Sequence, residues 1–343
     1  MFTPGPTMVP QEVLMAEAAP VIHHRTKAFS AVMNDVHEGL QKTFKTEQPV
    51  FVVMGSGTAA MEASVCNIVS PGDKAICVNG GKFGERWTDL CRTYGAEVVE
   101  ITLEWGKSFT EEMAAKALEE NPDAVALYCT HSETSTAALT DIEAIGKLTS
   151  QSDTLLVVDS ITGIGVHDFQ FDAWGVDVAV SGSQKGFMAP PGLGFIAVSE
   201  RAWDTIENCS SPRYYLDLAG MKKRFAKGQT PYTTAVSLVQ GMKKALDMIL
   251  EEGLDNVVAR HARLADAVRA AVDALGLKQL ADNPANGVTA VVAPEGLDIE
   301  AVRSAMRDVY GVQIAGGQAD YKGKICRLGH MGYVTEGEIL VLV

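Results

Sequence analysis

The sequence lacks the features that mark several large classes of protein. No apolar run is long enough to cross a bilayer, and its 343 residues contain no low-complexity tract and no internal repeat. No charged and then apolar leader opens the chain and no peroxisomal tripeptide ends it, so we expect neither export nor a membrane partner. Basic residues are few: 29 Lys and Arg against 43 Asp and Glu give a net charge of −14. Such an acidic chain is a poor candidate for binding nucleic acid.

Cysteine is also scarce, and no CxxC pair is present. The six cysteines are Cys66, Cys77, Cys91, Cys129, Cys209 and Cys326. Most stand in apolar contexts, which favours buried, reduced thiols and a cytoplasmic protein. A metal-ligand set is missing too. His23 and His24 have no third ligand at a suitable spacing, and a structural or loop role is favoured for them.

Both common nucleotide-binding motifs, GxxxxGK[ST] and GxGxxG, are absent. In their place, Gly55-Ser56-Gly57-Thr58 stands between a short apolar run at 49–54 and a helix expected near 59–69. A glycine-rich turn at a helix N-terminus presents backbone N–H groups and the positive end of the helix dipole. Phosphate binding is one interpretation of this turn, and an ordinary connection is the other.

Apolar residues make up 47% of the chain, enough for one large domain and a smaller one. Strands are expected at 74–78, 97–101, 124–129, 154–158, 176–180 and 194–198, and helices near 59–69, 84–94, 110–120 and 140–150. This alternation predicts a doubly wound α/β sheet. We expect an extended N-terminal segment (1–20), a large domain (21–252) and a small C-terminal domain (253–343) that mixes helices with short strands.

One lysine stands just past an expected strand end. The run at 176–180 is apolar and β-branched, as in a buried parallel strand, and Ser181-Gly182-Ser183-Gln184-Lys185 follows it. Ligands of open α/β sheets collect outside the carboxyl ends of the strands, and a desolvated lysine amine can form a Schiff base. A solvated surface lysine is the competing interpretation, and only other residues of the chain decide against it.

Other strand ends carry residues that suit the same crevice. Phe83 is either ordinary packing or a flat face for a bound ring, and the polar run 130–136 is either a pocket lining or a solvated loop. Asp159 ends a strongly apolar strand, where an acid needs a cationic or N–H partner. Arg327 stands inside an apolar strand expected at 325–328. Its anion is either a structural carboxylate or the carboxylate of a substrate.

Taken together, these features meet the chemical needs of pyridoxal phosphate. The lysine would hold the aldehyde as a Schiff base, and the acid would keep the pyridine nitrogen protonated so that the ring acts as an electron sink. The glycine turn would hold the phosphate, and the arginine would hold the carboxylate of an amino acid substrate.

The order of the motifs resembles that of the class V aminotransferases, and within them the alanine–glyoxylate, serine–glyoxylate and serine–pyruvate branch. The motifs are Pro4-Gly5-Pro6, residues 55–58, His131-Ser132-Glu133-Thr134-Ser135-Thr136, Val158-Asp159-Ser160, residues 181–185 with Pro190-Pro191-Gly192, and Cys326-Arg327-Leu328-Gly329. The resemblance implies the PLP-dependent transferase fold type I, a mostly parallel sheet of the seven-stranded type with helices on both faces and a smaller α+β C-terminal domain. It also implies a homodimer whose active sites lie at the subunit interface.

The resemblance further implies a role for each matching position. Lys185 forms the Schiff base, and Asp159 contacts the pyridine nitrogen. Phe83 stacks on the ring where tryptophan is common, which keeps a π-face but loses area and an N–H donor. Arg327 binds the substrate carboxylate, with Gly5 near the substrate. The remaining coenzyme contacts are Ser56, Gly57, Thr58 and Gln184 at the phosphate, Thr134 at the ring, and Thr230 and Thr233 at the phosphate of the neighbouring subunit.

The implied reaction moves an amino group from a small amino acid, alanine or serine, to glyoxylate or pyruvate. The amino acid displaces Lys185, which then moves a proton from Cα to C4′ of the coenzyme. The oxo acid leaves, and a second oxo acid reverses the sequence, so ping-pong kinetics are expected.

Other functions on this scaffold stay open. A lyase similar to the cysteine desulfurases needs a nucleophilic cysteine on a mobile loop, whereas Cys326 is expected in a strand. A 2-aminoethylphosphonate–pyruvate aminotransferase would use Arg327 equally well. A non-catalytic hydrogenase-associated subunit would not need both Lys185 and Asp159. Residues 338–343 look like the start of an amphipathic helix that relatives usually continue, so the small domain is either naturally short or truncated.

Overall fold

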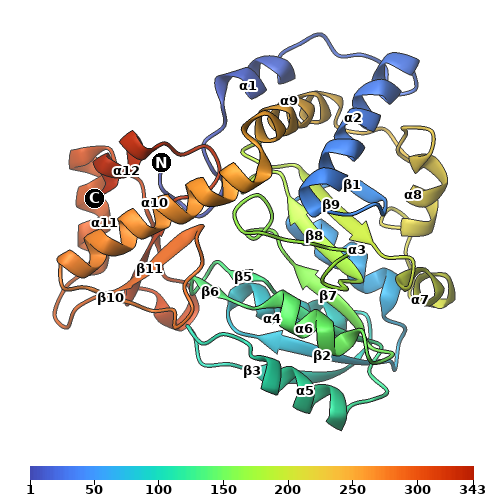
Figure 1. Cartoon of the computed structure of the whole chain (residues 1–343), viewed down its shortest axis with the longest axis horizontal. Coiled ribbons are helices and arrows are strands. Elements are labelled where there is room, and N and C mark those ends of the chain that lie inside the picture. Colours follow the sequence, from blue (N-terminus) through green and yellow to red (C-terminus); the bar gives the residue numbers. More distant parts are fainter.

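The computed structural model describes all 343 residues and is built around a seven-stranded sheet (Figure 1). In spatial order the strands are β1 (Val50–Met54), β9 (Leu193–Val198), β8 (Val178–Gly182), β7 (Leu155–Asp159), β4 (Ala126–Thr130), β2 (Lys74–Asn79) and β3 (Glu97–Thr102). Only β9 runs against the others, because it pairs antiparallel with both β1 and β8 while the remaining neighbours pair parallel. The carboxyl ends of six strands therefore meet at one edge of the sheet.

Helices cover both faces of this sheet. One face packs on α2 (Lys27–Phe44), α5 (Glu111–Glu120), α6 (Ile142–Thr149) and α9 (Val236–Glu252) through a cluster of 39 buried apolar residues. The other packs on α3 (Gly57–Ile68), α4 (Lys82–Thr93), α7 (Ala202–Asn208) and α8 (Leu218–Phe225) through a cluster of 26. Successive strand residues alternate between the clusters, so Val157 belongs to one and Val158 to the other. Burial on both faces explains the continuous apolar runs and confirms the predicted α/β fold.

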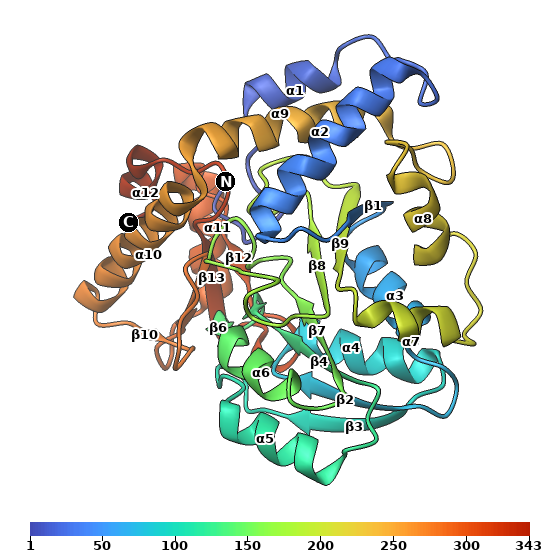
Figure 2. The same ribbon diagram turned by 45° about the vertical axis from the view of Figure 1, so that its right-hand side comes forward.

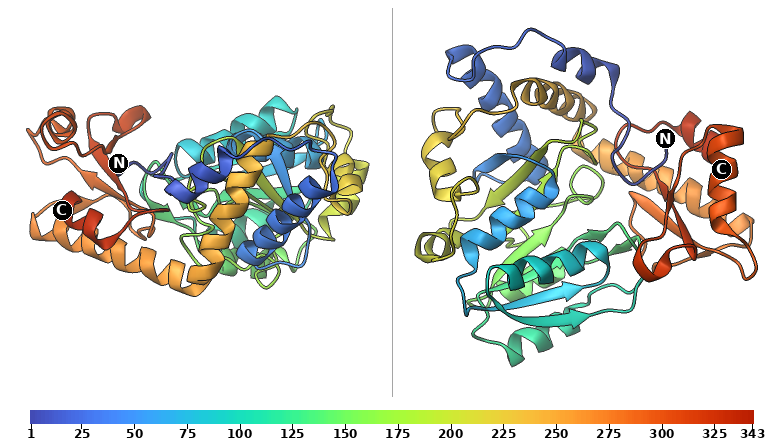
Figure 3. Two further views of the ribbon diagram at one scale, coloured as in Figure 1. Left: turned by 90° about the horizontal axis from the view of Figure 1, so that it is seen from above. Right: turned by 180° about the vertical axis from the view of Figure 1, so that it is seen from behind.

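A second, four-stranded sheet lies beside the first. Its order is β10 (Lys278–Gln279), β11 (Val288–Val292), β13 (Ile325–Gly329) and β12 (Ala315–Gly316), with every pair antiparallel. The helices α10 (Leu254–Ala274), α11 (Ile299–Tyr310) and α12 (Glu336–Leu342) pack around it over their own apolar cluster. Figure 3 shows α10 running from the end of α9 across to this sheet. The division of the chain into domains at residues 252 and 253 stays a prediction.

The boundaries of several helices follow from the local sequence. Thr26, Thr110 and Asp141 cap α2, α5 and α6, since each side chain accepts a backbone N–H of the first turn. Two short elements complete the chain: the hairpin of β5 (Ser132–Glu133) and β6 (Ala138–Leu139), and the single 3₁₀ turn η1 (Ala319–Tyr321). None of the helices combines the length and the apolar character needed to span a bilayer.

The N-terminal segment connects the two sheets. Phe2 is buried in the apolar cluster of the second sheet, and its backbone hydrogen-bonds to Gln313 and Gly329. A few residues later, Thr7 N donates to Gln184 O at 3.1 Å, beside the end of β8. Helix α1 (Gln11–Glu17) begins directly after Pro10, from where the sequence allows a helix, and it packs on α9 (Figure 2). Proline is well tolerated at a helix start because its missing N–H would have no partner there.

Candidate active site

The shared direction of six strands brings most of the candidate residues to one edge of the central sheet. The turn 55–58 follows β1, Phe83 follows β2, the run 131–136 follows β4, Asp159 ends β7, and Lys185 lies just beyond β8. Such an edge is where open α/β sheets bind ligands. The predicted strand ends agree with the observed ones to within about two residues, which confirms the predicted strands.

Lys185 lies under the N-terminal segment. Its Nζ donates a hydrogen bond to Pro4 O at 2.6 Å, and Thr7 Oγ1 donates one to Lys185 O at 3.1 Å. Gly5 has a φ of 126°, and a Cβ atom added there would collide with Nζ of Lys185. A residue with a side chain therefore cannot replace Gly5 without moving the lysine, because both the backbone conformation and the space exclude it.

The Lys185 amine is tuned towards its neutral form. Burial lowers the pKa of Lys185 to about 8, the charge of Asp159 opposes this shift, and the charges of Arg327 and Arg86 add to it. An amine with such a pKa is partly neutral near physiological pH, so it can act both as a nucleophile and as a base.

Asp159 is a buried carboxylate that accepts only one hydrogen bond from the chain. It is 3% exposed, and Oδ1 accepts a hydrogen bond from Ile161 N at 2.9 Å, whereas no group of the chain donates to Oδ2. Burial raises the pKa of Asp159 to about 7, and the Ile161 hydrogen bond and the charges of Arg86 and Lys185 hold it from rising further. The Asp159 carboxylate accepts no hydrogen bond from a charged donor of the chain. A protonated ring nitrogen would be such a donor and would stabilise the ionised carboxylate.

The turn before α3 has the properties of an anion cradle. Helix α3 begins at Gly57 without a side-chain cap, so the N–H groups of its first turn have no such partner. Gly182 lies next to both Gly57 N and Oε1 of Gln184, and this Oε1 is buried without a hydrogen bond. A Cβ atom at Gly57 would collide with Ile161, so the glycine lets the turn approach the loop after Asp159.

Glu133, which was not selected from the sequence, fixes the start of α4. Its Oε2 accepts hydrogen bonds from Phe83 N at 3.1 Å and Gly84 N at 2.9 Å, and its Oε1 accepts from Ser135 N and Ser135 Oγ at 3.0 and 2.5 Å. The half-buried Phe83 is thereby held at the edge of the crevice. Glu133 and Phe83 are 50 positions apart, so no local sequence pattern predicts their contact. The sequence shows only an acidic residue inside the run 131–136, and all residues of this run are buried.

Arg327 approaches this edge from the second sheet. It is 7% exposed, and it donates from Nε to Gly316 O at 2.9 Å and from Nη1 to Thr134 O at 3.0 Å. Oγ1 of Thr134 shares a hydrogen bond with Thr162 Oγ1 at 3.0 Å. Burial lowers the pKa of Arg327 and the charge of Glu133 opposes this shift, but no hydrogen bond joins Arg327 to a carboxylate of the chain. Which anion Arg327 binds stays a prediction.

Thr230 and Thr233 lie apart from the other candidates. Thr230 Oγ1 donates to Tyr232 O at 2.7 Å, and Thr233 Oγ1 shares a long contact of 3.4 Å with His24 Nε2. Neither threonine hydrogen-bonds to Lys185, Asp159 or the turn 55–58. Their expected role towards a neighbouring subunit stays a prediction.

The groups gathered at this edge fit pyridoxal phosphate: an amine tuned for imine chemistry, a buried carboxylate with an unused oxygen, uncapped N–H groups for a phosphate and an unpaired guanidinium. In agreement, the sequence matches the Aminotransferase class-V family over residues 1–341. This chain belongs to the class V aminotransferases. It is a PLP-dependent aminotransferase, and its cofactor is pyridoxal phosphate.

Individual class V relatives are similar over nearly the whole chain. The L-aspartate–glyoxylate aminotransferase of Paracoccus denitrificans is 37% identical, and the match covers 99% of this chain and 88% of that protein. A protein named soluble hydrogenase 42 kDa subunit, from Anabaena cylindrica, is 40% identical over 99% of this chain and 90% of its own. The crystal structure of alanine–glyoxylate aminotransferase from Nostoc sp. superimposes with a TM-score of 0.96 at 32% identity, covering 100% and 92% of the two chains. The predicted family and fold are thus confirmed.

Proposed function

We propose that this class V aminotransferase moves the amino group of a small amino acid to glyoxylate, with pyruvate as the alternative acceptor. The observation that carries the substrate class is the buried Arg327, which has no carboxylate partner and whose charge acts on Lys185. A planar guanidinium binds a carboxylate through two parallel hydrogen bonds, and Nη2 makes no hydrogen bond within the chain. The names of the Paracoccus and Nostoc relatives support glyoxylate as the acceptor.

The cover over Lys185 supports a donor with a small side chain. The Pro4 carbonyl and the backbone of Gly5 lie directly against the Nζ atom, and the segment is fastened at Phe2 and Thr7. Alanine and serine fit such a restricted space best. Aspartate is the competing donor, because the Paracoccus relative carries it in its name.

When bound, pyridoxal phosphate supplies an aldehyde that takes up amino groups and a ring that stores electrons. In the proposed mechanism, Asp159 holds a proton at the ring nitrogen and Phe83 orients the ring. Nζ of Lys185 would act as the base that removes a proton from Cα of the amino acid and then as the acid that gives this proton up, as its lowered pKa allows. Arg327 fixes the substrate carboxylate, and the N-terminal segment limits access of water.

Cysteine chemistry is not favoured. Cys326 lies in β13, is 6% exposed within the apolar cluster of the second sheet, and burial raises its pKa to about 11. A thiol in that state is a poor nucleophile. A purely structural, hydrogenase-associated role has only the name of the Anabaena relative in its favour. Such a role would not need a tuned Lys185 and an unpaired Asp159 side by side.

A substrate panel tests the proposed reaction. Alanine, serine and aspartate are each supplied to the holoenzyme with glyoxylate and with pyruvate, and the amino acid and oxo acid products are measured. We expect alanine or serine with glyoxylate to give the highest kcat/KM, and parallel lines in double-reciprocal plots, as a ping-pong mechanism requires. Turnover of aspartate alone would replace the proposed donor, and absence of turnover with every pair would contradict the proposal.

We also propose that the protein is a homodimer with shared active sites. Tyr214 and Tyr215 are 78% and 43% exposed, and both stack on Tyr232 with ring centroids 5.6 and 5.4 Å apart. Tyr232 lies in the loop between α8 and α9, which also carries Thr230 and Thr233. Exposed stacked aromatic residues are typical of protein interfaces, and a second copy of this chain is the occupant that the two threonines need to reach a coenzyme phosphate.

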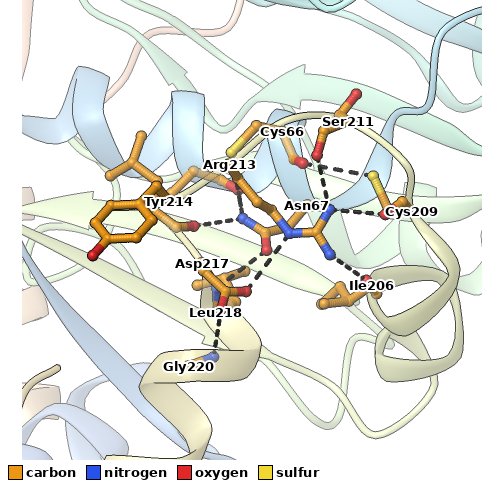
Figure 4. A network of polar contacts seen from close by, with 12 residues as sticks. Cys66, Asn67, Ile206, Cys209, Ser211, Arg213, Tyr214, Asp217, Leu218 and Gly220 are labelled. Atoms are coloured by element: carbon orange, nitrogen blue, oxygen red, sulfur yellow. Dashed lines mark hydrogen bonds and ion pairs between the residues drawn. The ribbon is translucent and has the colours of Figure 1, made fainter.

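The loop 209–217, which carries Tyr214 and Tyr215, is held rigidly, as Figure 4 shows. Arg213 donates to the carbonyls of Cys209, Ser211 and Ile206 at 2.9 to 3.2 Å and lies 3.6 Å from Asp217. Asn67 on α3 bonds to the backbone on both sides of Asp217. This rigidity supports a preformed interface. Light scattering is expected to give twice the mass of one chain, and a monomer that retains its coenzyme would contradict the proposal.

A reducing, cytoplasmic location completes the proposal. All six cysteines are free thiols and five of them are buried. Unpaired buried thiols are usual in compartments that keep cysteine reduced.

A further inference from the structure

Arg86 touches two separate parts of the candidate coenzyme site. It lies on α4 one turn after Phe83, and its guanidinium carbon is 5.1 Å from the centre of the Phe83 ring. Its Nη1 donates a hydrogen bond to Thr58 Oγ1 at 2.9 Å. One side chain therefore connects the aromatic face expected at the coenzyme ring with the turn expected at its phosphate.

Arg86 also lacks a negative partner within the chain. Its neighbours on the same helix are paired, Lys82 with Glu85 and Arg92 with Glu100, but no carboxylate lies within ion-pair distance of Arg86. The side chain is half-buried, and its charge influences both Asp159 and Lys185. A partly desolvated guanidinium with no counter-charge is costly unless an anion joins it.

The hydrogen bond from Arg86 to Thr58 determines in which direction the Thr58 hydroxyl can donate its proton. A hydroxyl group has one proton to donate and two lone pairs to accept with. Because Oγ1 of Thr58 accepts the Arg86 N–H, its own proton is left to be donated elsewhere. Thr58 stands in the first turn of α3, beside N–H groups that have no side-chain cap, so an anion held by this turn would receive that proton.

We propose that Arg86 makes this site select the phosphorylated form of its coenzyme, by adding a positive charge to the anion cradle and by fixing Thr58 as a donor to the phosphate. This inference rests on the proposed cofactor site around Lys185. It assigns to Arg86 a positioning role that the sequence motifs did not indicate. The ligand class is a phosphate monoester, and the aldehyde ring without its phosphate is the molecule that Arg86 discriminates against.

The test compares binding of pyridoxal phosphate and of pyridoxal to the apoenzyme by absorbance titration, with no turnover involved. In Arg86→Gln, we expect affinity for pyridoxal phosphate to fall about tenfold or more, as for loss of a charge-assisted contact, and affinity for pyridoxal to change less than about twofold. Arg86→Lys keeps the charge and is expected to recover part of the selectivity. Arg92→Gln, on the exposed side of the same helix, is the matched control and is expected to change neither affinity.

A second readout uses inorganic phosphate as the probe. Millimolar phosphate is expected to raise the melting temperature of the wild-type apoenzyme and to have a smaller effect on Arg86→Gln. Equal losses for pyridoxal phosphate and pyridoxal would show that Arg86 only supports the ring, and unchanged affinities would show no role; both results overturn the proposal. If Arg86→Gln does not fold, the titrations and the phosphate shift are measured on Arg86→Lys, where the loss of affinity for pyridoxal phosphate is expected to exceed that for pyridoxal. A wild-type protein that binds neither compound would instead refute the cofactor site itself.

Discussion

At the scale of single residues, the buried Asp159 lowers the folding stability of the apoenzyme at neutral pH and provides the carboxylate that the coenzyme ring needs. Its folded pKa of about 7 lies above the ordinary value of 3.8, so the folded apoenzyme binds a proton more tightly than the unfolded chain. Folding stability is therefore lost as the pH rises from about 4 to 7 and stays low above that. Only a protonated partner, such as a bound pyridine ring, would restore it.

Asp159→Asn is expected to stabilise the apoenzyme and to inactivate the holoenzyme. The free energy of unfolding in urea should rise by ~2–4 kcal/mol at pH 7.5 and change little at pH 4, since the buried charge is removed. Transamination should fall by several orders of magnitude, because nothing would hold the ring proton. Asp89→Asn, an exposed position on α4, is the control. A variant that is less stable than wild type at pH 7.5 would show that Asp159 has a partner.

Gly5→Ala tests the contact between the N-terminal segment and the lysine. The new methyl group would displace Nζ of Lys185, so we expect at least a tenfold loss of kcat with weaker coenzyme retention. Gly296→Ala has a comparable backbone requirement, with φ of 82°, but no atom lies within 4 Å of the added carbon. It should cost only backbone strain of about 1 kcal/mol and leave kcat unchanged. Equal kinetic effects of the two variants would contradict the contact.

At the scale of secondary-structure elements, the strand and helix pattern was readable because a parallel sheet buried on both faces produces long apolar runs separated by turns. Lys185, Asp159 and the 55–58 turn could be placed for the same reason: each lies at a strand end. The reversed direction of β9 left no trace in its apolar sequence. Contacts between distant segments were also missed, above all Pro4 with Lys185 and Glu133 with Phe83. They depend on how elements pack, and no local spacing encodes them.

Glu133→Gln is expected to weaken the start of α4. An amide offers one acceptor oxygen where the carboxylate offers two, so the hydrogen bonds from Phe83 and Gly84 or those from Ser135 lose their partner. The free energy of unfolding, measured in urea, should fall by ~1–3 kcal/mol. Glu85→Gln removes a carboxylate from the same helix that is 41% exposed, and should change stability by less than ~0.5 kcal/mol. Equal stability of Glu133→Gln and wild type would show that the contact carries no energy.

At the scale of the whole molecule, the half-buried His167 hydrogen-bonds from the loop after β7 to the segment before β11, while the buried His330 and His261 form hydrogen bonds around the second sheet. His167 Nε2 accepts from Asn286 N, His330 bonds to Asn286 and Thr289, and His261 accepts from Gly332 N. Burial lowers the pKa of His261 to about 3 and that of His330 to about 4, and it lowers that of His167 as well. These histidines therefore stay neutral in the folded protein at a pH where the unfolded chain already protonates them.

Stability is therefore expected to fall as the pH drops below 6.5. The unfolded chain binds protons at these histidines first, which removes up to ~1.4 kcal/mol per pH unit for each histidine until the pH reaches the folded pKa, about 4 for His330 and about 3 for His261. Asp159 has the opposite slope, so the measurement is best made on Asp159→Asn, by urea unfolding at pH 7, 6, 5 and 4.5. A flat profile would mean that the histidines are protonated in the folded state.

The central claim is that the amine of Lys185 carries the reaction. Borohydride reduction of the yellow holoenzyme, followed by peptide mass spectrometry, tests it most directly. We expect the reduced coenzyme on the peptide that contains Lys185, and no label and no transamination in Lys185→Ala although that variant folds. A label on another lysine, or transamination by Lys185→Ala, would contradict the claim.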